Sequence, residues 1–193
     1  MLKSQDKKKL EEYLAPHKSE SMFICSNLKA AGIVYNGAAF EGEYFGCFDK
    51  EDQLLGVIVH YSNGKIIMHA SNNMGLKQLT LHLKKYIHRA VSGVLGPATQ
   101  ASYVIKELGL PDSCFRINSC ERLYELCLSD LKDSAIPNNC NITPAHNVPK
   151  DILIKWMIDY QVEALGAIND DKLSEQVNKH IGHLSSNDCF VLV

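Results

Sequence analysis

Three side chains that can transfer protons lie within apolar stretches of the sequence: Glu43, His60 and His69. A histidine or a carboxylate can act as a general base when it lies within hydrogen-bonding distance of the proton that it removes. Nothing in their spacing couples these three residues. The favoured interpretation of each is therefore a surface residue or a satisfied core residue, and a general base is the alternative.

The remaining histidines form no complete metal motif. His180 and His183 are three positions apart and could share a metal ion, but no cysteine or carboxylate at a known spacing completes a zinc site. His82 and His88 do not share a helical face. We therefore expect no metal cofactor. The sequence also lacks a nucleophile elbow, a P-loop and a dinucleotide-binding fingerprint.

The segment that carries these candidates predicts an antiparallel meander. Its three short apolar runs span residues 43–49, 53–61 and 65–71. The turn at Asn63 and Gly64 is a strong hairpin signal, because both central positions of a type I′ turn need positive φ. A helix at 75–89 and a return strand at 91–95 then predict a right-handed parallel crossover. The second run is apolar on both faces, which predicts helices on both sides of the sheet.

Further elements are predicted on either side of the meander. Apolar spacing predicts helices at 4–15, 20–31 and 98–108. Ser19 is expected to cap the second helix and Gly32 to end it. Residues 121–128 alternate in character and predict another strand.

The composition changes at residues 132–140, a polar stretch typical of a linker. We expect one unit at 1–131 and a second, partial unit at 141–193. The second unit is predicted as strand, helix, helix and strand, at residues 141–146, 149–165, 171–183 and 189–193. The last strand needs a neighbour, either in its own chain or in a second copy, so a homodimer through residues 189–193 is one expectation.

Composition and charge narrow the class of protein. The chain has 193 residues, of which 46% are hydrophobic, as in ordinary globular proteins. A formal charge of −2 argues against a dedicated nucleic-acid binder. Neither a membrane span nor a secretory signal is evident. The seven scattered cysteines without a C-x-x-C motif predict reduced thiols and a cytoplasmic location.

The order of these elements resembles that of the GNAT acyl-CoA N-acyltransferases, over residues 22–131. Leu108-Gly109-Leu110 is similar to the Leu-Gly-Phe that ends the penultimate helix of the family. Residues 141–193 look like the start of a second GNAT unit. The whole resembles the N-terminal portion of tandem predicted acetyltransferases, in which a degenerate first half precedes a competent second half.

This resemblance implies a mixed α/β fold with a mostly antiparallel central sheet, helices on both faces and a splayed parallel strand pair. It also implies acetyl-CoA or another acyl-CoA as co-substrate. The family binds the acyl-CoA pyrophosphate with backbone amides at a helix N-terminus, after a Gln/Arg-x-x-Gly-x-Gly/Ala loop. Here that loop position is held by Asn72, Asn73, Met74, Gly75, Leu76 and Lys77. Only Gly75 matches the pattern, so these residues are either cofactor-binding or a simple strand-to-helix turn.

Many members of the family place a tyrosine general acid four residues before the glycine that corresponds to Gly109. Ile105 stands there in this chain, and Tyr103 is the nearest tyrosine, either a weak catalytic candidate or a packed aromatic residue. Two functions remain. The chain is a GNAT-type N-acetyltransferase-related protein without a complete catalytic site, or it is a non-catalytic binding, regulatory or dimerisation module with that fold.

Overall fold

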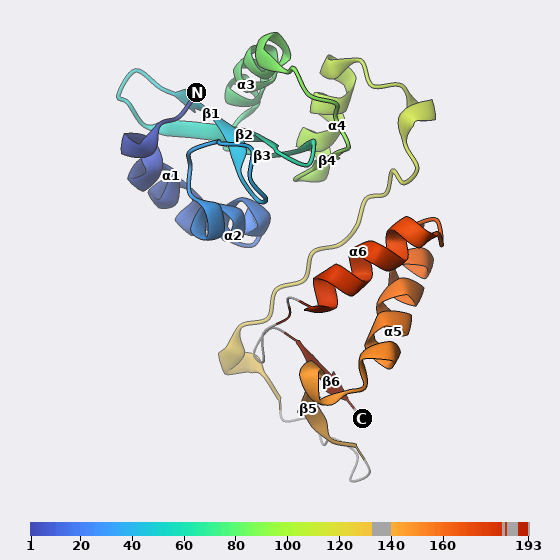
Figure 1. The fold of residues 1–193 in the computed structure, drawn as a ribbon. Helices are drawn as coiled ribbons and strands as arrows, with labels where there is room; N and C mark the ends of the chain where they lie inside the picture. The colour runs from blue at the N-terminus through green and yellow to red at the C-terminus, as the bar shows by residue number, and fades with distance from the viewer. Residues whose placement is uncertain (133–139, 183, 185–188, 193) are drawn as a thin grey trace. The chain divides into compact units, whose positions relative to one another are not determined.

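The structure is a computed structural model that describes residues 1–132, 140–182, 184 and 189–192 (Figure 1). Its internal contacts divide the chain into two compact units, which are described separately. The first contains Met1–Cys114 and Cys120–Glu125, and the second contains Phe115–Ser119 and Leu126–Val193. Most of the predicted linker at 132–140 lies outside the described residues.

A four-stranded mixed sheet forms the centre of the first unit. Its strands are β1 (Gly42–Phe48), β2 (Leu54–Tyr61), β3 (Lys65–Ala70) and β4 (Gly93–Leu95), in that spatial order. The first three strands pair antiparallel, and β4 pairs parallel to β3. The predicted meander and the parallel return strand are thus confirmed. The helix between the parallel strands, α3 (Asn73–Tyr86), begins and ends earlier than predicted.

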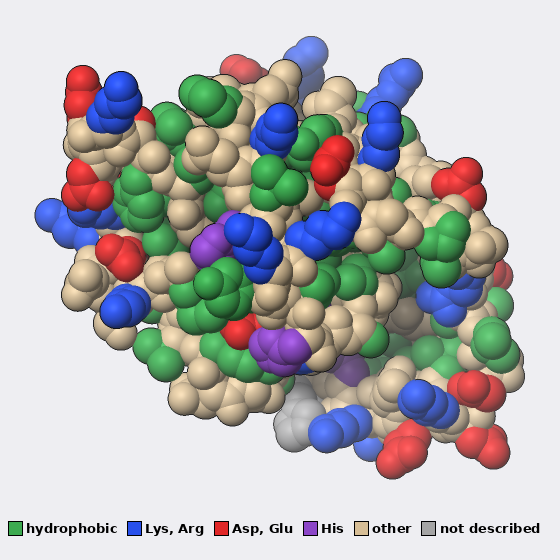
Figure 2. All heavy atoms as spheres, turned by 90° about the horizontal axis from the view of Figure 1, so that it is seen from above, with side chains coloured by type: hydrophobic (Ala, Val, Ile, Leu, Met, Phe, Trp, Pro, Cys, Tyr) green, Lys and Arg blue, Asp and Glu red, His purple; other side chains and the backbone are tan. Residues whose placement is uncertain are grey.

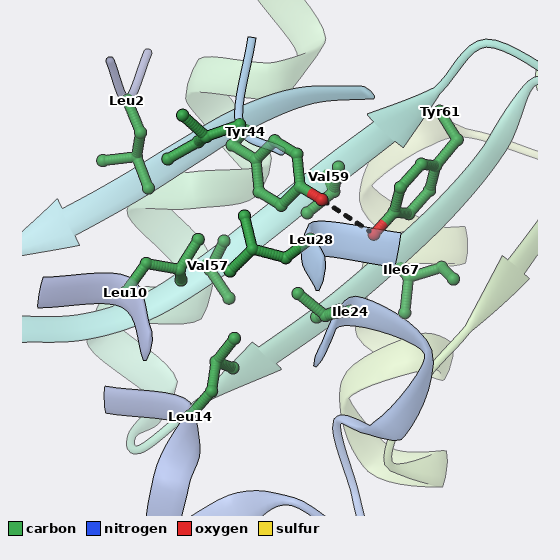
Figure 3. Packing of buried hydrophobic residues seen from close by; sticks show 11 residues of the cluster. Leu2, Leu10, Leu14, Ile24, Leu28, Tyr44, Val57, Val59, Tyr61 and Ile67 are labelled. Atoms are coloured by element: carbon green, nitrogen blue, oxygen red, sulfur yellow. Dashed lines mark hydrogen bonds between the residues drawn. The ribbon is translucent and has the colours of Figure 1, made fainter. Parts of the chain in front are cut away.

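Helices cover both faces of this sheet, as the two-sided apolar pattern predicted (Figure 1). On one face lie α1 (Lys7–Leu14) and α2 (Met22–Ala31), and on the other lie α3 and α4 (Ala98–Leu108). Successive side chains of a strand point to opposite faces of the sheet, so neighbouring residues of one strand belong to separate cores. Figure 3 shows the core under α1 and α2, which includes Leu10, Leu14, Ile24, Leu28, Tyr44, Val57, Val59, Tyr61 and Ile67.

The two parallel strands stay together for only three residue pairs, the last of which joins Ile67 to Leu95. The chain then turns away at Gly96, whose φ is 155°. A Cβ at that position would lie 2.8 Å from the carbonyl oxygen of Met68, so only glycine fits the turn. Pro97 follows as the N-cap of α4. The last residues of β3 therefore continue without β4 beside them.

A side chain takes the place of the missing strand at the end of β3. The amide of Gln100 accepts a hydrogen bond from the backbone N–H of Ala70 and donates one to its carbonyl oxygen, both at 2.9 Å. Unpaired backbone groups are costly where water is excluded, and this side chain satisfies both. The first turn of α4 is thereby fixed to the edge of the sheet.

Two predictions about local structure were wrong in the first 131 residues. Ser21, and not Ser19, precedes α2, and its hydroxyl donates to the carbonyl of His17. Residues 121–128 form no strand. Their large apolar side chains are exposed, for example Leu123 and Tyr124 at 54% and 80%. A strand needs a neighbour for its backbone groups, and none lies beside this segment among the described residues.

The second unit contains β5 (Ile142–Pro144), α5 (Lys150–Glu163), α6 (Asp171–Gly182) and β6 (Phe190–Leu192). This is the predicted order of strand, helix, helix and strand. The two strands pair antiparallel with each other, so the C-terminal strand finds a partner in its own chain. The last residue of the helix predicted at 171–183, His183, lies outside the described residues.

The apolar side of α5 is not buried. No residue of this helix is buried, and Ile152, Trp156 and Tyr160 are 37%, 47% and 54% exposed. These residues lie one turn apart, on one face of the helix. Two helices and a two-stranded sheet offer too little surface to cover a stripe of this width, because small units bury a small share of their surface.

Within the described residues, no helix is long and apolar enough to cross a membrane. On the face drawn in Figure 2, the Lys and Arg side chains stand apart and are separated by hydrophobic and other atoms.

The packing of α3 predicts that alanine substitutions of two leucines in this helix lower the stability of the protein by different amounts. Leu83 is completely buried and Leu81 is 44% exposed. We expect Leu83→Ala to lower the free energy of unfolding by about 2–5 kcal/mol, through lost burial and the cavity left behind. The matched control, Leu81→Ala, should change it by about 0.5 kcal/mol or less. Urea unfolding followed by circular dichroism measures both. Equal losses for the two variants would contradict this placement of α3.

Candidate functional site

His69 lies near the C-terminal end of β3 and opposite Val57, on the face that α1 and α2 cover. It is only 3% exposed. Its Nδ1 lies 2.8 Å from the hydroxyl of Tyr13 in α1, and its Nε2 lies 3.0 Å from Oε2 of Glu20, just before α2. The ring of His17 packs beside it, with ring centroids 4.3 Å apart. We call Tyr13, His17, Glu20 and His69 the His69 cluster.

The hydrogen bonds around Tyr13 assign the protons of this cluster. The hydroxyl of Ser71 donates to the Tyr13 oxygen at 3.2 Å. A carboxylate only accepts hydrogen bonds, so the contact of His69 with Glu20 requires that Nε2 of the neutral imidazole carries the proton; Nδ1 is then the acceptor for the Tyr13 hydroxyl, 2.8 Å away. The imidazole proton then lies on Nε2 and points to the carboxylate of Glu20. The result is a chain of hydrogen bonds from the end of β3 to an exposed carboxylate.

Burial determines the charge states of His69 and Tyr13. It lowers the pKa of His69, while the hydrogen bond to Glu20 raises it and the charge of His17 lowers it further. Burial also raises the pKa of Tyr13, against the effect of its hydrogen bonds with Ser71. A neutral imidazole beside a protonated phenol can accept a proton or bind a metal ion.

A second cluster forms on the opposite face of the sheet. Glu43 and His60 are directly paired across β1 and β2. The guanidinium of Arg89 lies 2.8 Å from the Glu43 carboxylate, donates to the carbonyl of His60 at 2.8 Å, and stacks 4.5 Å from the ring centre of Tyr35. Arg89 thus ties the segment after α3 to the first two strands.

The imidazole of His60 is completely buried in this second cluster. Neither ring nitrogen makes a well-formed hydrogen bond with the described residues. Burial and the positive charge of Arg89 lower its pKa, and Glu43 and the backbone of Ala90 only oppose these effects. His60 is therefore a neutral core residue without access to a substrate.

The loop predicted to bind pyrophosphate is capped by its own first residue. Asn72 is the N-cap of α3, and its Oδ1 accepts a hydrogen bond from the N–H of Gly75 at 2.8 Å. Its carbonyl accepts from the N–H of Leu76. Leu76 is buried in the core, whereas Met74 is 66% exposed and Lys77 points outward. The amides of Asn73 and Met74 remain at the helix start for an anion.

The two residues considered for the general-acid role lie on α4. Tyr103 is half-buried and packs against the core between the sheet, α3 and α4. Burial and the charge of Glu107 raise its pKa. Ile105 cannot donate a proton. The residue of α4 that reaches the end of β3 is Gln100.

The structure thus separates some of the predicted candidates and joins others. His69 lies close in the chain to Ser71 and Asn72, at the end of β3 where β4 has departed. Glu43 and His60 are coupled to each other and are separated from His69 by the sheet. His180 is exposed on α6, and its predicted partner His183 lies outside the described residues. Sequence reasoning missed Tyr13, His17, Glu20 and Gln100, because their partners are 30 or more positions away.

Comparisons with protein-family models, with curated proteins and with solved structures found no match for this chain.

The buried histidines predict a loss of stability on acidification. The pKa of His60 in the folded chain lies below its unfolded value of about 6.5. As the pH falls below that value, the unfolded chain takes up a proton that the folded chain does not bind. Stability that is present above about pH 6.5 is then lost as the pH approaches the folded-state pKa.

We therefore expect His60→Leu to reduce the drop in unfolding free energy between about pH 7.5 and pH 5.5, because it removes one such group. His180→Gln is the matched control at an exposed histidine that is not part of this cluster, and it should retain the drop. Urea unfolding at the two pH values gives the comparison. An unchanged drop in His60→Leu would show that this residue is not buried in its neutral form.

Proposed function

We propose that this chain is related to the GNAT acyl-CoA N-acyltransferases and that its first unit is a binding module that does not itself transfer an acyl group. The mixed sheet with helices on both faces supports the first part of this proposal, as does a parallel strand pair that separates after Ile67 and Leu95. Fold alone does not define an activity, so the second part depends on the residues at the strand separation.

The observation that carries the proposal is the pair of hydrogen bonds between Gln100 and Ala70. The resemblance to the family places acyl-CoA where the third and fourth strands diverge. In this chain the backbone groups at that edge are already bound by a side chain of the same unit. A ligand that paired with β3 there would have to displace Gln100 first and would lose the corresponding binding free energy.

Two further features support a module without acyl transfer. Asn72 already uses the amide of Gly75 at the start of α3, which leaves fewer donors for a pyrophosphate. Ile105 occupies the position of the general acid, and the nearby Tyr103 packs against the core. A thiolate leaving group would therefore have no proton donor on α4 at the expected place.

A second candidate function, acyl transfer to an amine, is favoured by the His69 cluster. His69 is neutral, lies at the end of β3, and is hydrogen-bonded to Glu20 and Tyr13. This arrangement is suited to a general base that removes a proton from an attacking amine. It requires Gln100 to move away from Ala70 when acyl-CoA binds.

Titration calorimetry with acetyl-CoA separates the two candidates. If the chain is a binding module in which Gln100 occupies the edge of β3, acetyl-CoA has no free backbone groups to bind there. We then expect no heat of binding for the unchanged chain at protein concentrations on the order of tens of micromolar. Binding of one acetyl-CoA per chain, followed by acylation of an amine that His69→Gln abolishes, would instead establish the second candidate and refute the first.

The role of Gln100 has its own test. Gln100→Ala should lower the free energy of unfolding by about 1–3 kcal/mol, because two backbone groups of Ala70 lose their partners. Lys106→Ala, at an exposed position of the same helix, is the matched control and should change it by about 0.5 kcal/mol or less. Urea unfolding measures both. Equal stability of the two variants would show that the hydrogen bonds of Gln100 to the backbone of Ala70 do not stabilise the protein.

A further inference from the structure

The His69 cluster brings together three side chains that are typical metal ligands. His17, Glu20 and His69 each offer one ligand atom, and these atoms all lie within 4.8 Å of one another. The Nε2 atom of His69 and the Oε2 atom of Glu20 are 3.0 Å apart. Two ligands of a tetrahedral zinc ion are separated by roughly 3.4 Å, given bond lengths of about 2.0–2.2 Å. The hydrogen-bonded pair is about 0.4 Å closer than this, so a small separation of the two atoms would give one edge of such a site.

The third ligand needs only a small movement. His17 is half-buried in the turn that follows α1, and its ring lies against the ring of His69, at an angle of 34°. A shift of its imidazole would bring its nitrogen to the same ion, without any change in β3. Two histidines and one carboxylate, with a fourth position for water, form a ligand set that zinc commonly uses in open sites.

The surroundings of His69 match those of a metal-bound histidine. Such histidines use one ring nitrogen for the metal and the other for a hydrogen bond that orients the ring. Nδ1 of His69 makes this bond with the Tyr13 hydroxyl, which leaves Nε2 directed at Glu20. When an ion binds Nε2, the single ring proton shifts from Nε2 to Nδ1, which then donates to the Tyr13 oxygen, and the Tyr13 hydroxyl turns to the carbonyl of Leu55 or of His69 itself.

Access and charge also suit a cation. The Glu20 side chain is 57% exposed, so the site opens to solvent, whereas His69 forms its buried floor. Burial lowers the pKa of His69, so an ion need not compete with a second proton near neutral pH. The carboxylate supplies the negative charge that a divalent ion requires.

We propose that His17, Glu20 and His69 form a binding site for a divalent transition-metal ion of the zinc class, with Tyr13 as the residue that orients His69. This proposal does not rest on acyl-CoA binding. It differs from the expectation of no metal, which considered only histidines that are close in sequence. The contacts that form it join α1, the turn before α2 and β3.

The test is a calorimetric titration of the full, reduced chain with Zn²⁺. We expect one site per chain, and His17→Gln and Glu20→Gln should each weaken it by at least about 10-fold. Tyr13→Phe should weaken it by roughly 10–100-fold, which is the usual cost of losing the orienting hydrogen bond. The matched controls, His88→Gln and Glu12→Gln, alter exposed residues outside the cluster and should bind as the unchanged chain does. Mg²⁺, which prefers six oxygen ligands, should not bind.

Exposed cysteines such as Cys114, Cys120 and Cys127 are competing zinc ligands, so a titration with Co²⁺ accompanies the first experiment. Nitrogen and oxygen ligands give only weak cobalt absorption, as we expect for the His69 cluster. Strong sulfur-to-cobalt charge transfer would place the ion on thiolates and overturn the proposal. Absence of Zn²⁺ binding would overturn it as well, and so would binding by His17→Gln and Glu20→Gln that is as tight as that of the unchanged chain.

Discussion

The backbone of β3 loses its parallel neighbour halfway along its length, and the first unit is arranged around the groups left unpaired there. The chain turns away at Gly96, where φ is 155° and a Cβ would lie 2.8 Å from the carbonyl oxygen of Met68, and Pro97 follows. The amide of Gln100 then satisfies both backbone groups of Ala70. The same interaction fixes α4 to the sheet, which closes the core that α3 and α4 share.

Strand alternation gives the two buried histidines of the sheet different environments. His60 faces the side of α3, where Arg89 and Glu43 bind each other and leave the imidazole without a good partner. His69 faces α1 and α2, where Tyr13 and Glu20 bind both of its nitrogens. Both are neutral because burial disfavours the charged ring. Only the second is connected to solvent through a hydrogen-bonded side chain, so it is the one suited to chemistry.

Much of the fold was predictable, and the errors have identifiable causes. The meander, the helix after it and the parallel return were recognised because their periodicity and turn residues are local signals. The strand predicted at 121–128 does not form, because alternation describes a strand only when another strand is beside it. The apolar stripe of α5 is not covered: Trp156 and Tyr160 remain exposed because the unit has too little surface to cover them.

By itself, the sequence determined the order of the helices and strands, the spacing of their apolar residues and the turns between them. These features depend on residues within a few positions of one another. Only the tertiary structure decided which polar side chains meet. Glu20 and His69 are 49 positions apart, and Gln100 and Ala70 are 30 apart. Such contacts depend on how helices are placed over a sheet, and that placement results from packing of the whole core. The candidate site therefore became visible only after α1 and α2 were positioned over β3.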